Sequence, residues 1–116
     1  MVLILEWEYI PPGEVRGNSR AHRFKRSRTV RTMRDSAYAQ ARGHAAMDRC
    51  SIKLEFWHSR SIDLDNLLIG AKPWVDGLVD ANVVPDDSPD HVRLEAPEFH
   101  KCLKGESKTI MEVRPL

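Results

Sequence analysis

A helical repeat enclosed by aspartates, between residues 60 and 90, is the feature that most constrains how this chain folds. Its apolar side chains recur at the spacing of one helical face, at positions Leu67, Ala71, Trp74, Val75 and Leu78. Asp63 and Asp65 stand just before the repeat, and Asp86 and Asp87 follow it after a short turn. The pattern predicts one amphipathic helix with a pair of carboxylates at each end.

The ends and the exposed face of this helix can also be predicted. Asp65 is a suitable N-cap, because its side chain can accept a hydrogen bond from the free amides of the next turn. Pro73 lacks the amide hydrogen that a helix interior uses, so we expect a kink or a short first segment there. Lys72 and Asp76 are four residues apart and should form an ion pair along the exposed face.

Alternating patterns on both sides of this stretch predict strands over Met1–Ile10 and Ser51–His58. Two more are expected over His91–Ala96, with Val92 and Leu94 inward, and Lys108–Val113, joined as an antiparallel pair by a turn at 104–107. An alanine-rich segment, Met33–Met47, favours a second helix. The chain is therefore predicted to be one α+β domain over residues 1–116, with a small mixed sheet and two main helices.

Positive charge is concentrated in Arg16–Arg34, which holds eight basic residues and no acid, although the formal net charge is only +1. We expect Glu14–Thr32 to be a loop or irregular arm, because it has little apolar periodicity. Guanidinium groups donate paired hydrogen bonds to phosphate oxygens, so this arm could hold nucleic acid through its backbone. The candidate DNA-binding residues are Arg16, Arg20, Arg23, Lys25, Arg26, Arg28 and Arg31. The alternative is a solvated face paired with the protein's own acids.

The composition of the chain excludes disordered proteins and membrane proteins. With 41% hydrophobic and 30% charged residues the chain is neither disordered nor a membrane protein. The apolar run Met1–Leu5 is too short for a signal peptide or a spanning helix, so a cytoplasmic location is expected. In a reducing compartment Cys50 and Cys102 should remain free thiols.

The acidic groups suggest a chemistry. Clustered carboxylates repel one another, and a hard divalent cation such as Mg²⁺ neutralises them through oxygen ligands. Asp63 and Asp65 can face the same side of an extended segment, and Asp87 would complete a metal cage if the loop after the helix returns beside them. Asp86 is an alternative ligand or could bind a second ion. Lys72 could stabilise negative charge on a phosphate under attack.

Three segments in this order resemble the RusA family of Holliday-junction resolvases, in particular its phage-type members. They are Asp63-Leu64-Asp65-Asn66-Leu67-Leu68, then Lys72-Pro73-Trp74-Val75-Asp76-Gly77-Leu78, then Val84-Pro85-Asp86-Asp87-Ser88. The resemblance covers about residues 62–92, and the rest of the chain only through the order of its elements. It implies a RusA-like domain that acts as a homodimer and cuts branched DNA with Mg²⁺ or Mn²⁺, in a bacterial cell and encoded by a phage or prophage.

The resemblance also assigns roles. The three catalytic acids of the family correspond to Asp63, Asp65 and Asp87, and its catalytic lysine corresponds to Lys72. In some members that lysine stands closer to the first acids, near the position of Ile69. A shift of three residues is close to one helical turn, so Lys72 could still point the same way.

Two other functions remain open. One is a non-catalytic protein that recognises branched DNA by its structure, although binding alone would not need acids, which repel phosphate. The other is a metal-dependent hydrolase that acts on a different phosphoester and would require a substrate pocket.

Overall fold

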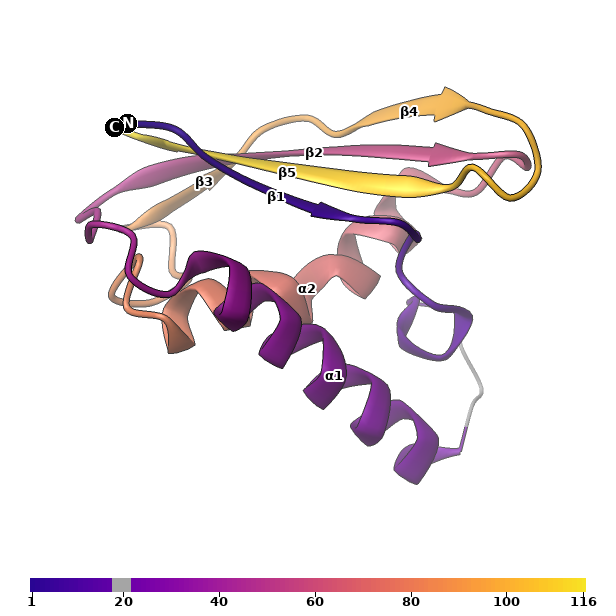
Figure 1. Cartoon of the computed structure of the whole chain (residues 1–116), viewed down its shortest axis with the longest axis horizontal. Coiled ribbons are helices and arrows are strands. Elements are labelled where there is room, and N and C mark those ends of the chain that lie inside the picture. Colours follow the sequence, from indigo (N-terminus) through magenta and orange to yellow (C-terminus); the bar gives the residue numbers. More distant parts are fainter. Residues whose placement is uncertain (18–21) are drawn as a thin grey trace.

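The computed structural model describes residues 1–17 and 22–116, and it has two helices packed on one face of a mixed sheet (Figure 1). The strands are β1 (Leu3–Trp7), β2 (Cys50–His58), β3 (Val92–Leu94), β4 (Glu98–Lys101) and β5 (Lys108–Pro115). The helices are α1 (Arg23–Ala41) and α2 (Leu64–Asp80), preceded by a short 3-10 turn, η1 (Gly13–Val15). The predicted α+β class, with a small mixed sheet and two main helices, is confirmed.

The sheet is organised around β2, which alternates buried and partly exposed residues as its sequence predicts. One edge of β2 pairs antiparallel with β5, which in turn pairs antiparallel with β1. The other edge carries two short strands in succession, β3 beside its first half and β4 beside its second half. Both of these pairings are parallel, because α2 carries the chain back along the sheet before β3 begins.

The predicted antiparallel pair formed by His91–Ala96 and Lys108–Val113 is therefore wrong. The first strand shortens to Val92–Leu94 and pairs with β2, while β5 lies on the opposite side of β2. Val92 is buried as expected, but Leu94 is 55% exposed. Strand β4 has a single partly buried apolar residue, Phe99, so its sequence lacked the alternation that identifies a strand.

Helix α1 begins ten residues earlier and ends earlier than predicted. Arg23–Thr32 is helical and not an irregular arm, although its apolar periodicity is weak because burial starts only at Met33. Arginine and lysine are good helix formers, and Nδ1 of His22 accepts a hydrogen bond from the amide of Phe24 at the N-terminus of the helix. The helix ends at Ala41, and Gly43 follows with a φ of 84°, a conformation that suits glycine.

Helix α2 spans the predicted apolar pattern as one continuous helix with Pro73 inside it, so the expected short first segment does not occur. Pro73 is buried together with Leu67, Ala71, Trp74 and Leu78. Burial of this face outweighs the cost of a proline in a helix interior, about 3 kcal/mol for the lost hydrogen bond and the clash of the ring together. No helix in the described ranges is both long and apolar enough to cross a membrane.

The two helices approach each other closely at Gly77. A Cβ atom at Gly77 would lie 2.6 Å from the Cβ of Ala37 and 2.6 Å from the carbonyl oxygen of Arg34. In a solvent-exposed helix, alanine is more stable than glycine by about 1 kcal/mol. Here the backbone of α1 would have to move, so we expect Gly77→Ala to lower the free energy of unfolding by about 1–3 kcal/mol in urea titrations.

Gly13→Ala is the matched control, because a Cβ atom at Gly13 meets no atom within 4 Å. Its free energy of unfolding should stay within about 0.5 kcal/mol of the wild-type value. A Gly77→Ala protein as stable as Gly13→Ala would show that the helices can separate at this crossing without loss.

Candidate active site

The first two predicted metal ligands lie at the start of α2. Asp63 occupies the N-cap position and Asp65 lies in the first turn, so the prediction that Asp65 caps the helix is wrong by two residues. The side chain of Asp63 makes no capping hydrogen bond. Both residues are exposed. Negative charge is favourable near a helix N-terminus, which would explain one carboxylate here but does not require two.

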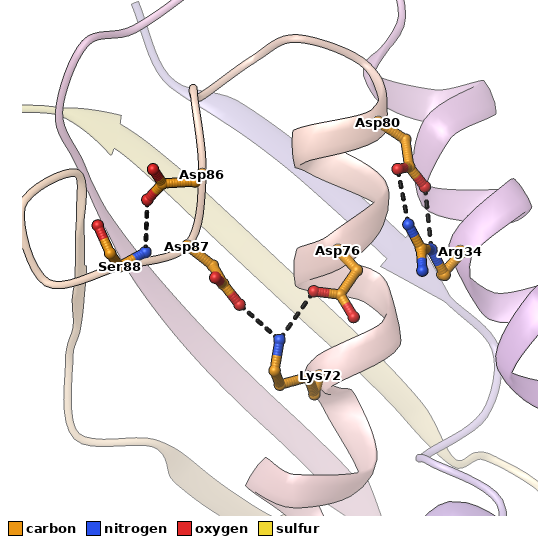
Figure 2. A network of polar contacts seen from close by, with 7 residues as sticks. All are labelled: Arg34, Lys72, Asp76, Asp80, Asp86, Asp87 and Ser88. Carbon is orange, nitrogen blue, oxygen red and sulfur yellow. Dashed lines mark hydrogen bonds and ion pairs between the residues drawn. The ribbon is translucent and has the colours of Figure 1, made fainter.

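Lys72 connects α2 to the loop that follows it (Figure 2). Its Nζ atom lies 2.8 Å from Oδ1 of Asp76, one helical turn further along, which confirms the predicted pair within α2. The same Nζ lies 2.5 Å from Oδ2 of Asp87, which is 15 residues away in the sequence. The loop therefore returns beside α2, and it brings Asp87 to Lys72.

The charges of these three groups influence one another. Hydrogen bonds from Lys72 to Asp76 and then to Asp87 raise the pKa of the lysine, so it stays an ammonium at neutral pH. The hydrogen bond from Lys72 is also the main cause of the lowered pKa of Asp87, which stays a carboxylate. Exposed ion pairs contribute only about 0–1 kcal/mol to folding, so stability alone is a weak reason for this arrangement. The side chain of Lys72 is 58% exposed.

Asp86 and Asp87 point in different directions although they are neighbours (Figure 2). Oδ1 of Asp86 accepts a hydrogen bond from the amide of Ser88 at 2.8 Å. The side chain of Ser88, and then this amide, lower the pKa of Asp86. The other oxygen of Asp86 lies 3.9 Å from Nε2 of His91. Asp86 thus stabilises the turn, whereas Asp87 faces Lys72.

The acids at the start of α2 and the acid in the loop remain separate within one chain. Asp65 and Lys72 are seven residues apart, which places them on the same helical face but about 10 Å apart along the axis. The ligand atoms of Asp63, Asp65 and Asp87 are not all within 4.8 Å of one another; in the described residues that spacing is met by Glu55, Glu98 and His100. The three aspartates therefore do not form a single closed cage.

Two hollows meet at Lys72. The first lies between α2 and β3, and Lys72 and Asp87 line it together with Leu68 and Leu94. The second lies between α1 and α2, and it is lined by Arg26 as well as Lys72 and Asp76. Since Lys72 and Leu68 border both, the two hollows adjoin each other at these residues, one reaching Arg26 on α1 and the other reaching Asp87.

Most of the predicted DNA-binding residues lie on α1. Arg23, Lys25, Arg26, Arg28 and Arg31 are all exposed, whereas Arg20 lies outside the described residues. Nε of Arg26 donates to the carbonyl of Glu14, and Nε of half-buried Arg16 donates to the carbonyl of Pro11, so these two also hold the segment before α1.

Arg34, the last basic residue of the predicted basic stretch, has an acidic partner. Arg34 donates two hydrogen bonds to Asp80 at 2.7 and 3.0 Å, which link α1 to α2. The alternative of internal ion pairing is therefore correct for Arg34, which was not among the candidate DNA-binding residues.

Asp76 belongs to the site, although the sequence predicted only its ion pair with Lys72 and no functional role. Asp76 shares the ammonium of Lys72 with Asp87, so it completes a carboxylate–ammonium–carboxylate network. The four-residue spacing of Asp76 from Lys72 indicated the contact between them, but no local pattern indicated the contact of Lys72 with Asp87. Both cysteines are free, as predicted.

Comparison with protein-family models and with curated proteins finds no match to this chain.

Proposed function

We propose that this protein is a divalent-metal-dependent endodeoxyribonuclease that resolves Holliday junctions or related branched DNA by hydrolysing phosphodiester bonds. The observation that carries the proposal is the contact between Lys72 and Asp87, which borders one hollow and adjoins a second that reaches Arg26. This arrangement places the Lys72 ammonium, which can act on a phosphate, beside the Asp87 carboxylate. The hollow that reaches Arg26 provides a path for a polyanion. The ordered resemblance of residues 62–92 to the RusA family supports the same conclusion.

The donor atoms are suitable for Mg²⁺ or Mn²⁺. Mg²⁺ is usually held by only one or two carboxylates together with substrate phosphate and water, so a closed cage of three aspartates is not required. Asp63 and Asp65 could hold such an ion at the start of α2, and Asp87 provides a carboxylate beside Lys72. Asp86, which faces Ser88 and His91, could bind a second ion. A bound ion would polarise the phosphodiester and lower the pKa of the attacking water.

The chain's own residues have separate tasks in this proposal. The Lys72 ammonium stabilises the negative charge that develops on the phosphate oxygens. Asp76 and Asp87 hold that ammonium at the junction of the two hollows, and they keep it protonated. Asp87 would share its carboxylate between Lys72 and a metal ion, so it is the residue on which the site depends most.

The start of α1 supports phosphate binding. Arg23, Lys25 and Arg26 lie in its first turns, where no acidic residue is present. A helix N-terminus carries a partial positive charge, so cations there are unfavourable unless an anion is bound nearby. The exposed first half of α1 is therefore suited to the phosphate backbone of DNA.

A homodimer is part of the proposal. A four-way junction with two-fold symmetry presents two equivalent bonds to be cut, and a two-fold protein presents two equivalent sites. The protein would then act in the cytoplasm of a bacterial cell, as a phage or prophage product.

The deciding experiment uses a labelled four-way junction, with linear duplex of the same sequence as the control. We expect paired cuts in the junction in the presence of Mg²⁺ or Mn²⁺, and no cuts in EDTA or in the linear duplex. Asp65→Asn should bind the junction but not cut it. Tight binding by the wild-type protein without cleavage in either metal would instead support the non-catalytic branch-binding function.

The contribution of α1 to DNA binding can be measured from the dependence of the binding constant on salt concentration. Lys25 and Arg28 are exposed in its first two turns. We expect the double variant Lys25→Ala/Arg28→Ala to bind the junction more weakly and to lower the slope of log K against log salt by about 0.9 for each phosphate that it no longer neutralises. The matched control is Lys101→Ala/Lys104→Ala, which removes two exposed charges at the far end of β4. Equal slopes for the two variants would exclude α1 as the DNA-binding element.

A further inference from the structure

A second group of possible metal ligands lies on the sheet face opposite the helices. Strand β4 is a four-residue edge strand, and in its parallel register with β2 Glu98 is the partner of Glu55 and His100 the partner of Trp57. Residues two apart in a strand share a face, so all four side chains lie on the same side. One ligand atom from each of Glu55, Glu98 and His100 lies within 4.8 Å of the other two.

Among the described residues, the two carboxylates of this group outnumber the one ammonium that pairs with them. Two carboxylates directly opposite each other on neighbouring strands destabilise the pairing. Nζ of Lys53 lies 2.8 Å from Oε2 of Glu98, and this contact is the main cause of the lowered pKa of Glu98. One ammonium offsets one of the two carboxylates, so a negative charge remains beside the His100 ring when that ring is neutral.

The His100 ring is held in place by its neighbours. It stacks on Trp57 with ring centroids 4.6 Å apart and an interplanar angle of 22°. On the same tryptophan, Nζ of Lys108 lies 4.6 Å from the ring centroid. A ligand whose orientation is already restricted loses less freedom when it binds a metal, and such supporting contacts commonly affect metal affinity.

We propose that Glu55, Glu98 and His100 form a binding site for a divalent transition-metal ion of the Zn²⁺ type, which fastens the edge strand β4 to β2. An imidazole nitrogen with two carboxylate oxygens suits Zn²⁺ or Co²⁺ better than Mg²⁺, which prefers oxygen alone. Ligand atoms in zinc sites lie about 2.0–2.2 Å from the ion, and hence about 3–3.6 Å from one another. The three ligand atoms already lie within 4.8 Å of one another and would approach further on binding the ion.

Lys53 is the built-in competitor of the ion. Because Lys53 pairs with Glu98, a metal ion must share this carboxylate with the ammonium of Lys53 or displace the ammonium. Removal of Lys53 should therefore strengthen metal binding, whereas removal of a ligand should weaken it. These opposite directions distinguish a metal site from a group of polar side chains that merely stabilise the sheet.

The test is a titration of the full chain with Co²⁺, followed by visible absorbance, and with Zn²⁺, followed by calorimetry. It uses Asp63→Asn/Asp87→Asn protein, so that the site proposed at α2 does not contribute. We expect one ion per chain, with His100→Gln and Glu98→Gln each weakening binding by more than tenfold, since even supporting contacts affect affinity by about 10- to 100-fold. Lys53→Gln should bind more tightly than its parent.

Two controls address other ligands and folding. His44→Gln removes a histidine outside the group, and Cys102→Ser removes the partly exposed thiol; neither should change the affinity. Zn²⁺ should raise the melting temperature of the parent protein but not that of His100→Gln. Zn²⁺ affinity that is unchanged in His100→Gln and in Lys53→Gln would overturn the proposal, and so would a loss of affinity in Cys102→Ser.

Discussion

Asp87→Asn should reduce cleavage of a four-way junction by about 10²–10³-fold or more, while junction binding is retained. An amide keeps the shape of the side chain but loses the charge that attracts a divalent ion. The substitution also removes one of the two anions that hold the ammonium of Lys72, so Lys72 would remain bound to Asp76 alone. Both effects act on the same phosphate, and the loss should therefore appear in the rate of single-turnover cleavage.

Asp90→Asn is the matched control, because it removes an exposed aspartate three residues further along the same loop. Its cleavage rate should stay within about twofold of the wild-type rate, since it lies outside the proposed site. Binding in both variants can be measured by gel shift in EDTA. If Asp87→Asn cleaves as fast as Asp90→Asn, the loop carboxylate has no part in the chemistry.

Trp74→Ala should lower the free energy of unfolding by about 3–5 kcal/mol, a large share of the stability of a domain of this size. Trp74 is fully buried between α2 and the sheet. Its ring stacks on Trp7 with centroids 4.0 Å apart and lies 5.7 Å from the ring of Tyr9. Truncation would leave a cavity beneath two aromatic rings from the first strand and the segment after it. Urea unfolding followed by circular dichroism measures the loss.

Two further variants separate the effect of ring packing at Trp74 from the effect of its polar Nε1 group. Nε1 of Trp74 is buried, and within the described residues it has no hydrogen-bond partner. Trp74→Phe removes this unpaired donor and keeps an aromatic ring, so it should cost less than about 1.5 kcal/mol. Trp57→Ala changes a partly exposed tryptophan on the other face of the sheet and should cost less than Trp74→Ala. Equal losses for Trp74→Phe and Trp74→Ala would mean that ring packing is not what Trp74 contributes.

Several features were determined by the sequence because they depend on local spacing. The strand β2 follows from the alternation of Ser51–His58, and α2 follows from apolar residues repeated at helical intervals. The pair formed by Lys72 and Asp76 follows from their separation of four residues. These signals also led to the correct fold class, because two helices and several short strands in one small chain have few ways to bury their apolar faces.

Other features were decided only by the tertiary structure. The first half of α1 is a charged, exposed helix, so it lacks the periodicity that burial imposes on a sequence. The partners of β3 and β4 depend on where α2 delivers the chain, which no local pattern encodes. The meeting of Asp87 with Lys72, and that of Glu98 with Glu55, join residues distant in sequence. Such contacts arise from the path of the backbone around a shared core, and only the folded chain defines that path.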